Sequence, residues 1–198
     1  MSMGYRRKIL DYADENNGMV TSTWCVSEGI PTVYLSRMVK DGELHRVDRG
    51  IYSVSESDYD DFKIFQLKNK AAIFSYSSAL FLLGRTDIIP NLIEVTVYTG
   101  YNTSHFPDSV IVHYVAKELL EIGRTSVETS MGHSVVCYDV ERTVCDLICN
   151  RNKVDAELVA KTLQAYVKEK DKNLNILFAY ARKMKCLKKV QEIMEVLL

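Results

Sequence analysis

Residues 29–54, GIPTVYLSRMVKDGELHRVDRGIYSV, constrain the possible folds more than any other part of this sequence. A helical repeat of apolar residues begins at Pro31 or Thr32, and the Asp-Gly pair at 41–42 ends it. Residues typical of β-strands follow directly after this pair, from Leu44 onward. The stretch therefore predicts a short helix joined directly to extended structure.

The second half of this stretch predicts a β-hairpin. Its two β-type runs are Leu44–Val47 and Ile51–Val54, and the three-residue loop between them ends in Gly50. Such a loop favours glycine at its last position, because that residue takes a positive φ. Arg46 and Arg49 lie on the strand and at the tip of this hairpin.

Two helical patterns come before it. Tyr5–Asn16 repeats apolar residues at helical spacing, and a shorter helix starts at one of the hydroxyl residues 21–23, which suit an N-cap. Three short helices followed by a hairpin are the order of a winged helix-turn-helix. We therefore predict an α+β protein whose residues 1–54 form a winged helix-turn-helix DNA-binding domain.

The rest of the chain predicts a larger mixed α/β domain that ends in a helical region. An acidic linker at 55–61, SESDYDD, precedes it, and these charges suit the positive end of the next helix. The second domain then spans residues 62–198. Its predicted helices are 62–70, 77–83, 140–149, 155–170, 173–185 and 187–198, and its predicted strands are 93–98 and 110–115, with a hairpin at 125–138.

Charge is unevenly distributed along the chain. The net charge is −1, with seven basic and seven acidic residues in 1–54, seven and thirteen in 55–149, and eleven and six in 150–198. The candidate DNA-binding domain is therefore neutral as a whole. Any affinity for DNA must come from the local placement of its cations.

The third helix has two distinct faces. A rotation of 100° per residue places Leu35, Met38 and Val39 on the core side. On the other side, Arg37 suits a guanine edge and Val33 a thymine methyl group, as the second helix of a helix-turn-helix enters the major groove. The candidate DNA contacts are Thr23, Thr32, Val33, Tyr34, Ser36, Arg37, Lys40, Arg46 and Arg49.

A surface helix shows cations opposite its core even when it binds nothing, so a solvated polar face is the alternative interpretation. The hairpin beside the helix favours DNA binding. The cations at 6–8, on the first helix, predict only an exposed charged surface. A neutral domain predicts modest, salt-sensitive affinity for a single copy.

The five cysteines are odd in number and form no CxxC pair. This favours reduced, packed thiols, including Cys145 and Cys149, which are four residues apart. The N-terminus lacks an apolar signal core, and no run of about 18 apolar residues is present. We expect a cytoplasmic protein.

No stretch of the second domain predicts an active site or a cofactor. The four histidines lack metal-ligand spacing and are expected to be structural. Asp139 and Glu141 suit amides at a helix start, and Arg142 and Asp146 are expected to form a surface ion pair. We therefore predict no catalysis, no metal and no cofactor.

Four blocks of the sequence resemble the AbiEi antitoxins of type IV toxin–antitoxin (abortive infection) systems. They are GELHRVDRGIY at 42–52, FSYSSAL at 74–80, PNLIEVTV at 90–97 and VERTVCDL at 140–147. In order they cover about residues 20–150. The second resembles the family's FSHxTAL segment, except that Tyr76 stands where that pattern often has histidine.

The resemblance implies a bacterial, cytoplasmic antitoxin encoded beside an AbiEii-type nucleotidyltransferase toxin. Antitoxins of this kind bind inverted repeats in their own promoter through the winged helix and repress the operon. The larger domain, residues 62–198 here, is implied to counteract the toxin without forming a stable complex with it. The absence of a long apolar heptad favours a monomer in solution that pairs on DNA.

The C-terminal helices carry a net positive charge. Their lysines and arginines suit either an acidic or nucleic-acid surface or simple solvation. The possible antitoxin surface comprises Lys161, Lys168, Lys172, Arg182 and Lys185.

Two alternatives to the antitoxin hypothesis remain open on sequence. A winged-helix transcription regulator whose second domain senses a ligand predicts operator affinity that depends on an effector. An enzyme in residues 62–198 predicts turnover that a single carboxylate or serine substitution abolishes.

Overall fold

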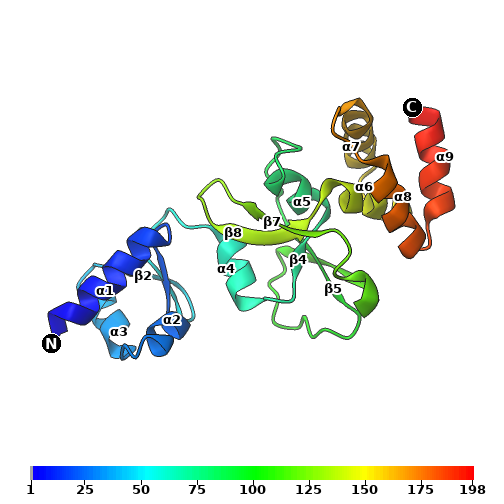
Figure 1. The fold of residues 1–198 in the computed structure, drawn as a ribbon. Helices are drawn as coiled ribbons and strands as arrows, with labels where there is room; N and C mark the ends of the chain where they lie inside the picture. The colour runs from blue at the N-terminus through cyan, green and yellow to red at the C-terminus, as the bar shows by residue number, and fades with distance from the viewer. Residues whose placement is uncertain (1) are drawn as a thin grey trace. The chain divides into compact units, whose positions relative to one another are not determined.

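The computed structural model describes residues 2–198 and has two compact units (Figure 1). Unit 1 comprises the chain up to Lys68 together with Glu128–Val135, and unit 2 comprises Asn69–Val127 and Val136–Leu198. The expected linker at 55–61 and the first helix after it thus fall inside unit 1. A second segment, from the 125–138 hairpin, also belongs to unit 1.

Unit 1 is a winged helix-turn-helix with one more helix and a three-stranded sheet in the order β1-β3-β2. Both strand pairs of this sheet are antiparallel. The predicted three helices and hairpin are confirmed, whereas β1 was not predicted, because three residues carry no readable alternation. The elements of unit 1 are α1 (Ser2–Glu15), β1 (Met19–Thr21), α2 (Ser22–Ser27), α3 (Val33–Lys40), β2 (His45–Asp48), β3 (Ile51–Ser53) and α4 (Asp61–Lys68).

The core of unit 1 fixes the three N-terminal helices against the sheet. Ile9 of α1, Cys25 of α2, and Leu35 and Met38 of α3 are fully buried in one cluster. Trp24 of α2 stacks on Tyr12 of α1, with ring centroids 3.7 Å apart. α2 and α3 are therefore held as one rigid pair.

A buried polar network around Asp60 explains why the acidic stretch is not a free linker. Asp60 is 4% exposed, and its carboxylate accepts hydrogen bonds from Thr129 Oγ1 at 2.5 Å and from His133 Nδ1 at 3.0 Å. The same carboxylate caps α4 by accepting from the amide of Lys63 at 3.1 Å. Asp60 thus joins the start of α4 to the tip of the hairpin at 128–135.

Unit 2 contains a five-stranded sheet in the order β6-β5-β4-β8-β7. β5 is parallel to β6 and antiparallel to β4, and β4 is parallel to β8. The predicted strands at 93–98 and 110–115 are confirmed, and the two-residue strand β4 was not predicted. The strands are β4 (Ile73–Phe74), β5 (Ile93–Tyr98), β6 (Val110–Val115), β7 (Arg124–Glu128) and β8 (Ser134–Tyr138), with a short 3-10 helix η1 (Lys117–Leu119) before β7.

The C-terminal helices pack around α6. Val144, Cys145, Leu147 and Ile148 of α6 are buried in one cluster with side chains from all the other helices of unit 2. Burial raises the pKa of the Cys145 thiol to about 12, so this thiol is an inert packing group. The helices of unit 2 are α5 (Tyr76–Leu82), α6 (Val140–Cys149), α7 (Ala156–Lys168), α8 (Leu174–Lys183) and α9 (Leu187–Leu197).

The expectation that Arg142 and Asp146 form a surface ion pair is wrong. Arg142 is 0% exposed and Asp146 3% exposed, and Arg142 Nε donates to Asp146 Oδ2 at 3.0 Å. Arg142 Nη1 also donates to the carbonyls of Leu119 and Ile122 at 2.7 and 2.8 Å. The pair is buried because α6 is covered on every side. Burial raises the pKa of Asp146 to about 6, and the attraction of Arg142 opposes that shift.

The expectation that all five thiols are reduced is also corrected. Cys149, at the end of α6, and Cys186, just before α9, form a disulfide. The packing of α6 against α9 brings together two residues that are 37 positions apart, which no local spacing signals. Cys25, Cys137 and Cys145 are free and buried.

Candidate nucleic-acid interface

α2 and α3 are joined by a tight turn that the sequence specifies. Thr21 caps α2 by accepting a hydrogen bond from the amide of Trp24 at 3.1 Å. The helix ends at Gly29, whose φ is +67°, and the amide of Ile30 donates back to the carbonyl of Cys25 at 2.7 Å. Because Ile30 is buried, this turn fixes the direction in which α3 leaves.

α3 presents the predicted polar face to solvent. Leu35 and Met38 are buried, whereas Ser36, Arg37 and Lys40 are exposed and Val33 is 47% exposed. Val33, Ser36, Arg37 and Lys40 occupy the surface opposite the core, as the helical period requires. The chemistry of this face suits the major groove, with a guanidinium, a hydroxyl and an apolar group.

Three further candidate residues flank α3. Thr32 precedes the helix, is exposed, and makes no side-chain capping bond. Thr23 on α2 is also exposed. Tyr34 is half-buried and packs edge-on against Tyr5 of α1, with ring centroids 5.2 Å apart. The Arg37 guanidinium carbon lies 5.6 Å from the centroid of the Tyr34 ring, which limits where this side chain can point.

The wing is attached to the start of α2 through Gly50. Its carbonyl accepts a hydrogen bond from the amide of Ser22 at 2.8 Å, and its φ is +75°. A Cβ at this position would lie 2.6 Å from Ser22 Oγ. The glycine therefore allows both the turn at the wing tip and the close approach of the wing to the helix-turn-helix.

We expect Gly50→Ala to destabilise the protein more than Gly29→Ala. Both substitutions place a side chain at positive φ, which costs roughly 1–2 kcal/mol. Only Gly50→Ala also displaces Ser22, since nothing lies within 4 Å of a Cβ at Gly29. Urea unfolding of the two variants measures the difference, and equal losses would show that the wing is not held against α2.

The basic residues of α1, at positions 6–8, form ion pairs with carboxylates. Arg6 pairs with both Asp41 and Glu43, the acidic residues that follow α3. Arg7 pairs with Asp11 at 2.8 Å, and Lys8 pairs with Glu28 at 2.8 Å. These ion pairs are exposed and contribute little stability. The pairs of Arg6 nevertheless neutralise the two acidic residues that follow α3.

The basic residues of α3 and of the wing form no ion pair among the described residues. Within residues 2–198, Arg37, Lys40 and Arg49 form no ion pair, and Arg46 donates only to the carbonyl of Asp48, at 3.4 Å. All four side chains are exposed. Guanidinium and ammonium groups without carboxylate partners are available to phosphate and base oxygens.

The acidic residue of the wing is itself neutralised. Asp48 Oδ2 accepts from Lys68 Nζ at 2.7 Å, and its Oδ1 accepts from the amide of Arg49 at 2.5 Å. The hydrogen bond from Lys68 lowers the pKa of Asp48 below its usual range. The carboxylate thus shapes the wing tip while its ion pair is formed with Lys68 of α4.

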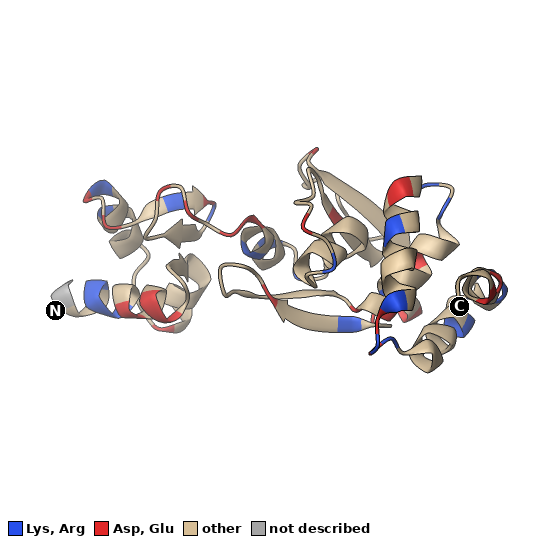
Figure 2. Cartoon of the chain, turned by 90° about the horizontal axis from the view of Figure 1, so that it is seen from above, with Lys and Arg blue, Asp and Glu red and all other residues tan. Residues whose placement is uncertain are grey.

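Basic residues are spread over both units, as Figure 2 shows in blue. On the C-terminal helices, Lys161 pairs with Glu157 at 2.6 Å, and Lys172 donates to the carbonyl of Glu169 at 3.0 Å. Among the described residues, Lys168, Arg182 and Lys185 are exposed cations without an ion-pair partner. Of the five residues of the possible antitoxin surface, two therefore have a polar partner within the protein, and three form no ion pair.

In unit 2, the side chains of Ser77 and His113 both contact the carboxylate of Glu94. Glu94 accepts from Ser77 Oγ at 2.5 Å and contacts His113 Nε2 at 2.8 Å, and the His113 ring stacks on Tyr76 at 3.8 Å. Ser77 therefore faces a carboxylate, whereas nucleophilic activation of serine by histidine requires a direct bond between the two. In the described chain, no three His, Cys, Asp or Glu side chains are placed to hold a metal ion.

Comparison with known proteins agrees with the geometry of unit 1. Residues 7–55 match the family described as "Transcriptional regulator, AbiEi antitoxin". No curated protein matches the chain. None of the described helices combines the length and hydrophobicity needed to cross a bilayer. Over its winged-helix residues 7–55, the chain is therefore similar to the AbiEi antitoxin family of transcriptional regulators.

Proposed function

We propose that this protein is a type IV antitoxin that represses its own operon and counteracts a nucleotidyltransferase toxin of the AbiEii type. The observation that carries the DNA-binding part is the contrast in unit 1 between paired and unpaired cations. Arg6, Arg7 and Lys8 are held by carboxylates, whereas the cations of α3 and the wing tip are exposed and unpaired. The family match over the same unit supports a regulator.

The proposed DNA contacts divide by role. Arg37, Ser36 and Val33 on α3 read base edges in the major groove, and Lys40 and Tyr34 contact the flanking backbone. Arg46 and Arg49 on the wing contact the neighbouring phosphates, and Thr23 and Thr32 contribute hydroxyl groups. Two copies on inverted repeats in the promoter give the operator its symmetry.

The antitoxin activity is proposed to reside in the larger domain and to require no stable complex with the toxin. Lys168, Arg182 and Lys185 are surface cations of this domain that form no ion pair with a carboxylate of the described residues. They suit an acidic or nucleic-acid surface on which the toxin also acts. The protein is proposed to work in the bacterial cytoplasm, where its promoter lies.

Full-length variants test whether the two activities are separable. Arg37→Ala/Arg49→Ala should derepress a reporter driven by the operon's promoter and still restore growth to cells that express the toxin. Lys168→Glu/Arg182→Glu/Lys185→Glu should do the reverse, with similar protein levels by immunoblot. Loss of toxin protection in the first variant, or unchanged repression by it, would contradict the proposed division of roles.

A further inference from the structure

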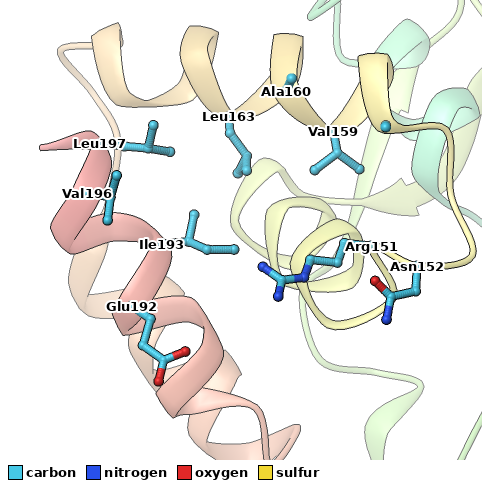
Figure 3. A pocket seen from close by; sticks show the side chains of 10 residues that line it. Arg151, Asn152, Val159, Ala160, Leu163, Glu192, Ile193, Val196 and Leu197 are labelled. Atoms are coloured by element: carbon cyan, nitrogen blue, oxygen red, sulfur yellow. The ribbon is translucent and has the colours of Figure 1, made fainter.

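Unit 2 has an open apolar groove of about 600 Å³ between α7 and α9 (Figure 3). Val159 and Leu163 of α7 point into it and face Ile193 of α9. Val159 and Leu163 are 9% and 6% exposed and form its floor. Beside it, Val196 of α9 is 83% exposed, which leaves an apolar side chain in water at the edge of an apolar hollow.

Opposite charges stand on the two walls of this groove. Arg151, in the loop between α6 and α7, extends toward α9, and Glu192 lies on α9 itself. No carboxylate among the described residues pairs with Arg151. Glu192 forms a long ion pair with Lys188 of the same helix, at 3.9 Å. Arg151 is therefore an exposed cation without a carboxylate partner in the described chain, and Glu192 is an exposed anion held only by this long contact.

We propose that a second copy of this chain occupies the groove in a two-fold symmetric contact. Such a contact uses the same patch on both copies, so the patch must be complementary to itself. This patch meets the requirement in two ways. It presents an exposed apolar side chain, Val196, next to the apolar groove, and it presents a cation, Arg151, opposite an anion, Glu192. In the pair, Val196 of each copy enters the groove of the other, and Arg151 of each copy meets Glu192 of its partner.

The small side chains on α7 support this arrangement. Ala156 and Ala160 line the groove one helical turn apart and are exposed. They allow the backbone of an approaching helix to come close, since interaxial distance depends on the side chains at the contact. The open groove holds one face of a helix, which suits helix-in-groove docking.

The contact is expected to be weak in free solution. Once two copies are bound to neighbouring DNA sites, the contact becomes intramolecular, with an effective concentration that reaches about the millimolar range. The groove thus supplies a surface for a chain that is monomeric when dilute and paired on DNA. The pairing itself does not rest on the proposed DNA binding, because it is measured without DNA.

Charge exchange at positions 151 and 192 tests the proposal. In Arg151→Glu, like charges face each other twice in the pair, and the same holds for Glu192→Arg. Each variant alone should self-associate at least about tenfold more weakly than the wild-type chain, because like-charge contacts across an interface are strongly unfavourable. An equimolar mixture of the two variants should associate as the wild type does, since the mixed pair regains both ion pairs, one in the native orientation and one reversed.

Sedimentation equilibrium of the full-length proteins without DNA gives the dissociation constants. Lys153→Glu, in the same loop but outside the groove, is the matched control and should leave association unchanged. Val196→Glu should weaken it without loss of fold, because the residue is exposed. A wild-type chain that stays monomeric at every concentration, or a mixture that associates no better than either single variant, would overturn the proposal. Binding of an apolar dye in the groove of a strictly monomeric chain would assign the groove to a small ligand instead.

Discussion

Arg142→Ala should lower the free energy of unfolding by about 3–5 kcal/mol, the usual loss when one member of a buried ion pair is removed. The substitution leaves the Asp146 carboxylate buried without its cation. It also leaves the carbonyls of Leu119 and Ile122 without their donor. Each of these partly buried acceptors costs further stability where water cannot reach it.

The surroundings of Arg142 leave little room for relaxation. Its guanidinium carbon lies 4.1 Å from the centroid of the Tyr138 ring. Gly123, at a φ of +73°, approaches so closely that a Cβ there would lie 2.4 Å from Arg142 Cβ. Removal of the side chain therefore opens a cavity lined by polar groups, which collapse cannot readily close.

Denaturant unfolding of Arg142→Ala and Arg182→Ala separates this role from a general effect of lost charge. Arg182 is an exposed arginine on α8, and its removal should change the free energy of unfolding by no more than about 0.5 kcal/mol. Arg142→Met/Asp146→Leu should recover only part of the loss, because the carbonyls of Leu119 and Ile122 stay unpaired. A loss below about 1 kcal/mol for Arg142→Ala would show that the pair is solvated.

Periodicity and turn chemistry were sufficient to predict the three N-terminal helices and the hairpin of unit 1 from sequence. The 100° repeat placed Leu35 and Met38 in the core and Arg37 outside, and the structure agrees because a short helix on a sheet has one apolar face. Gly50 takes the positive φ expected at the end of the hairpin loop. These features depend on neighbours within a few positions, which a single sequence displays directly.

Features that depend on residues far apart in the chain could not be predicted from the sequence in this way. Arg142 and Asp146 have the i, i+4 spacing of any exposed helical ion pair, and only the packing of other helices over α6 buries them. Asp60 meets His133 across 73 positions. The two-residue strand β4 exists only because neighbouring strands pair with it. Tertiary context decides each of these cases.

The candidate DNA interface could be predicted only in part from the sequence. Its residue types and helical face follow from local sequence, but the availability of each cation does not. Arg6 and Arg37 are both arginines on short N-terminal helices, and only the fold shows that Asp41 and Glu43 engage the former. The structure therefore adds the distinction between paired and unpaired cations.

The second large effect concerns DNA. Arg37→Ala/Arg49→Ala should weaken binding to the promoter duplex by at least about 2 kcal/mol, because a base contact of about 1–3 kcal/mol is lost together with a separate phosphate contact, and the effects of distant sites add. The loss of Arg49, a proposed phosphate contact, should also reduce the slope of log affinity against log salt concentration by about 1. Arg7→Ala is the matched control, since Arg7 is exposed but paired with Asp11.

Fluorescence anisotropy titration of a labelled promoter duplex with these variants, at two salt concentrations, tests the central claim most directly. We expect Arg7→Ala to bind within about twofold of the wild type and Arg37→Ala/Arg49→Ala to bind at least about 30-fold more weakly, the equivalent of about 2 kcal/mol. Wild-type affinity in Arg37→Ala/Arg49→Ala, or an equal loss in Arg7→Ala, would contradict the assignment of α3 and the wing as the DNA-binding surface.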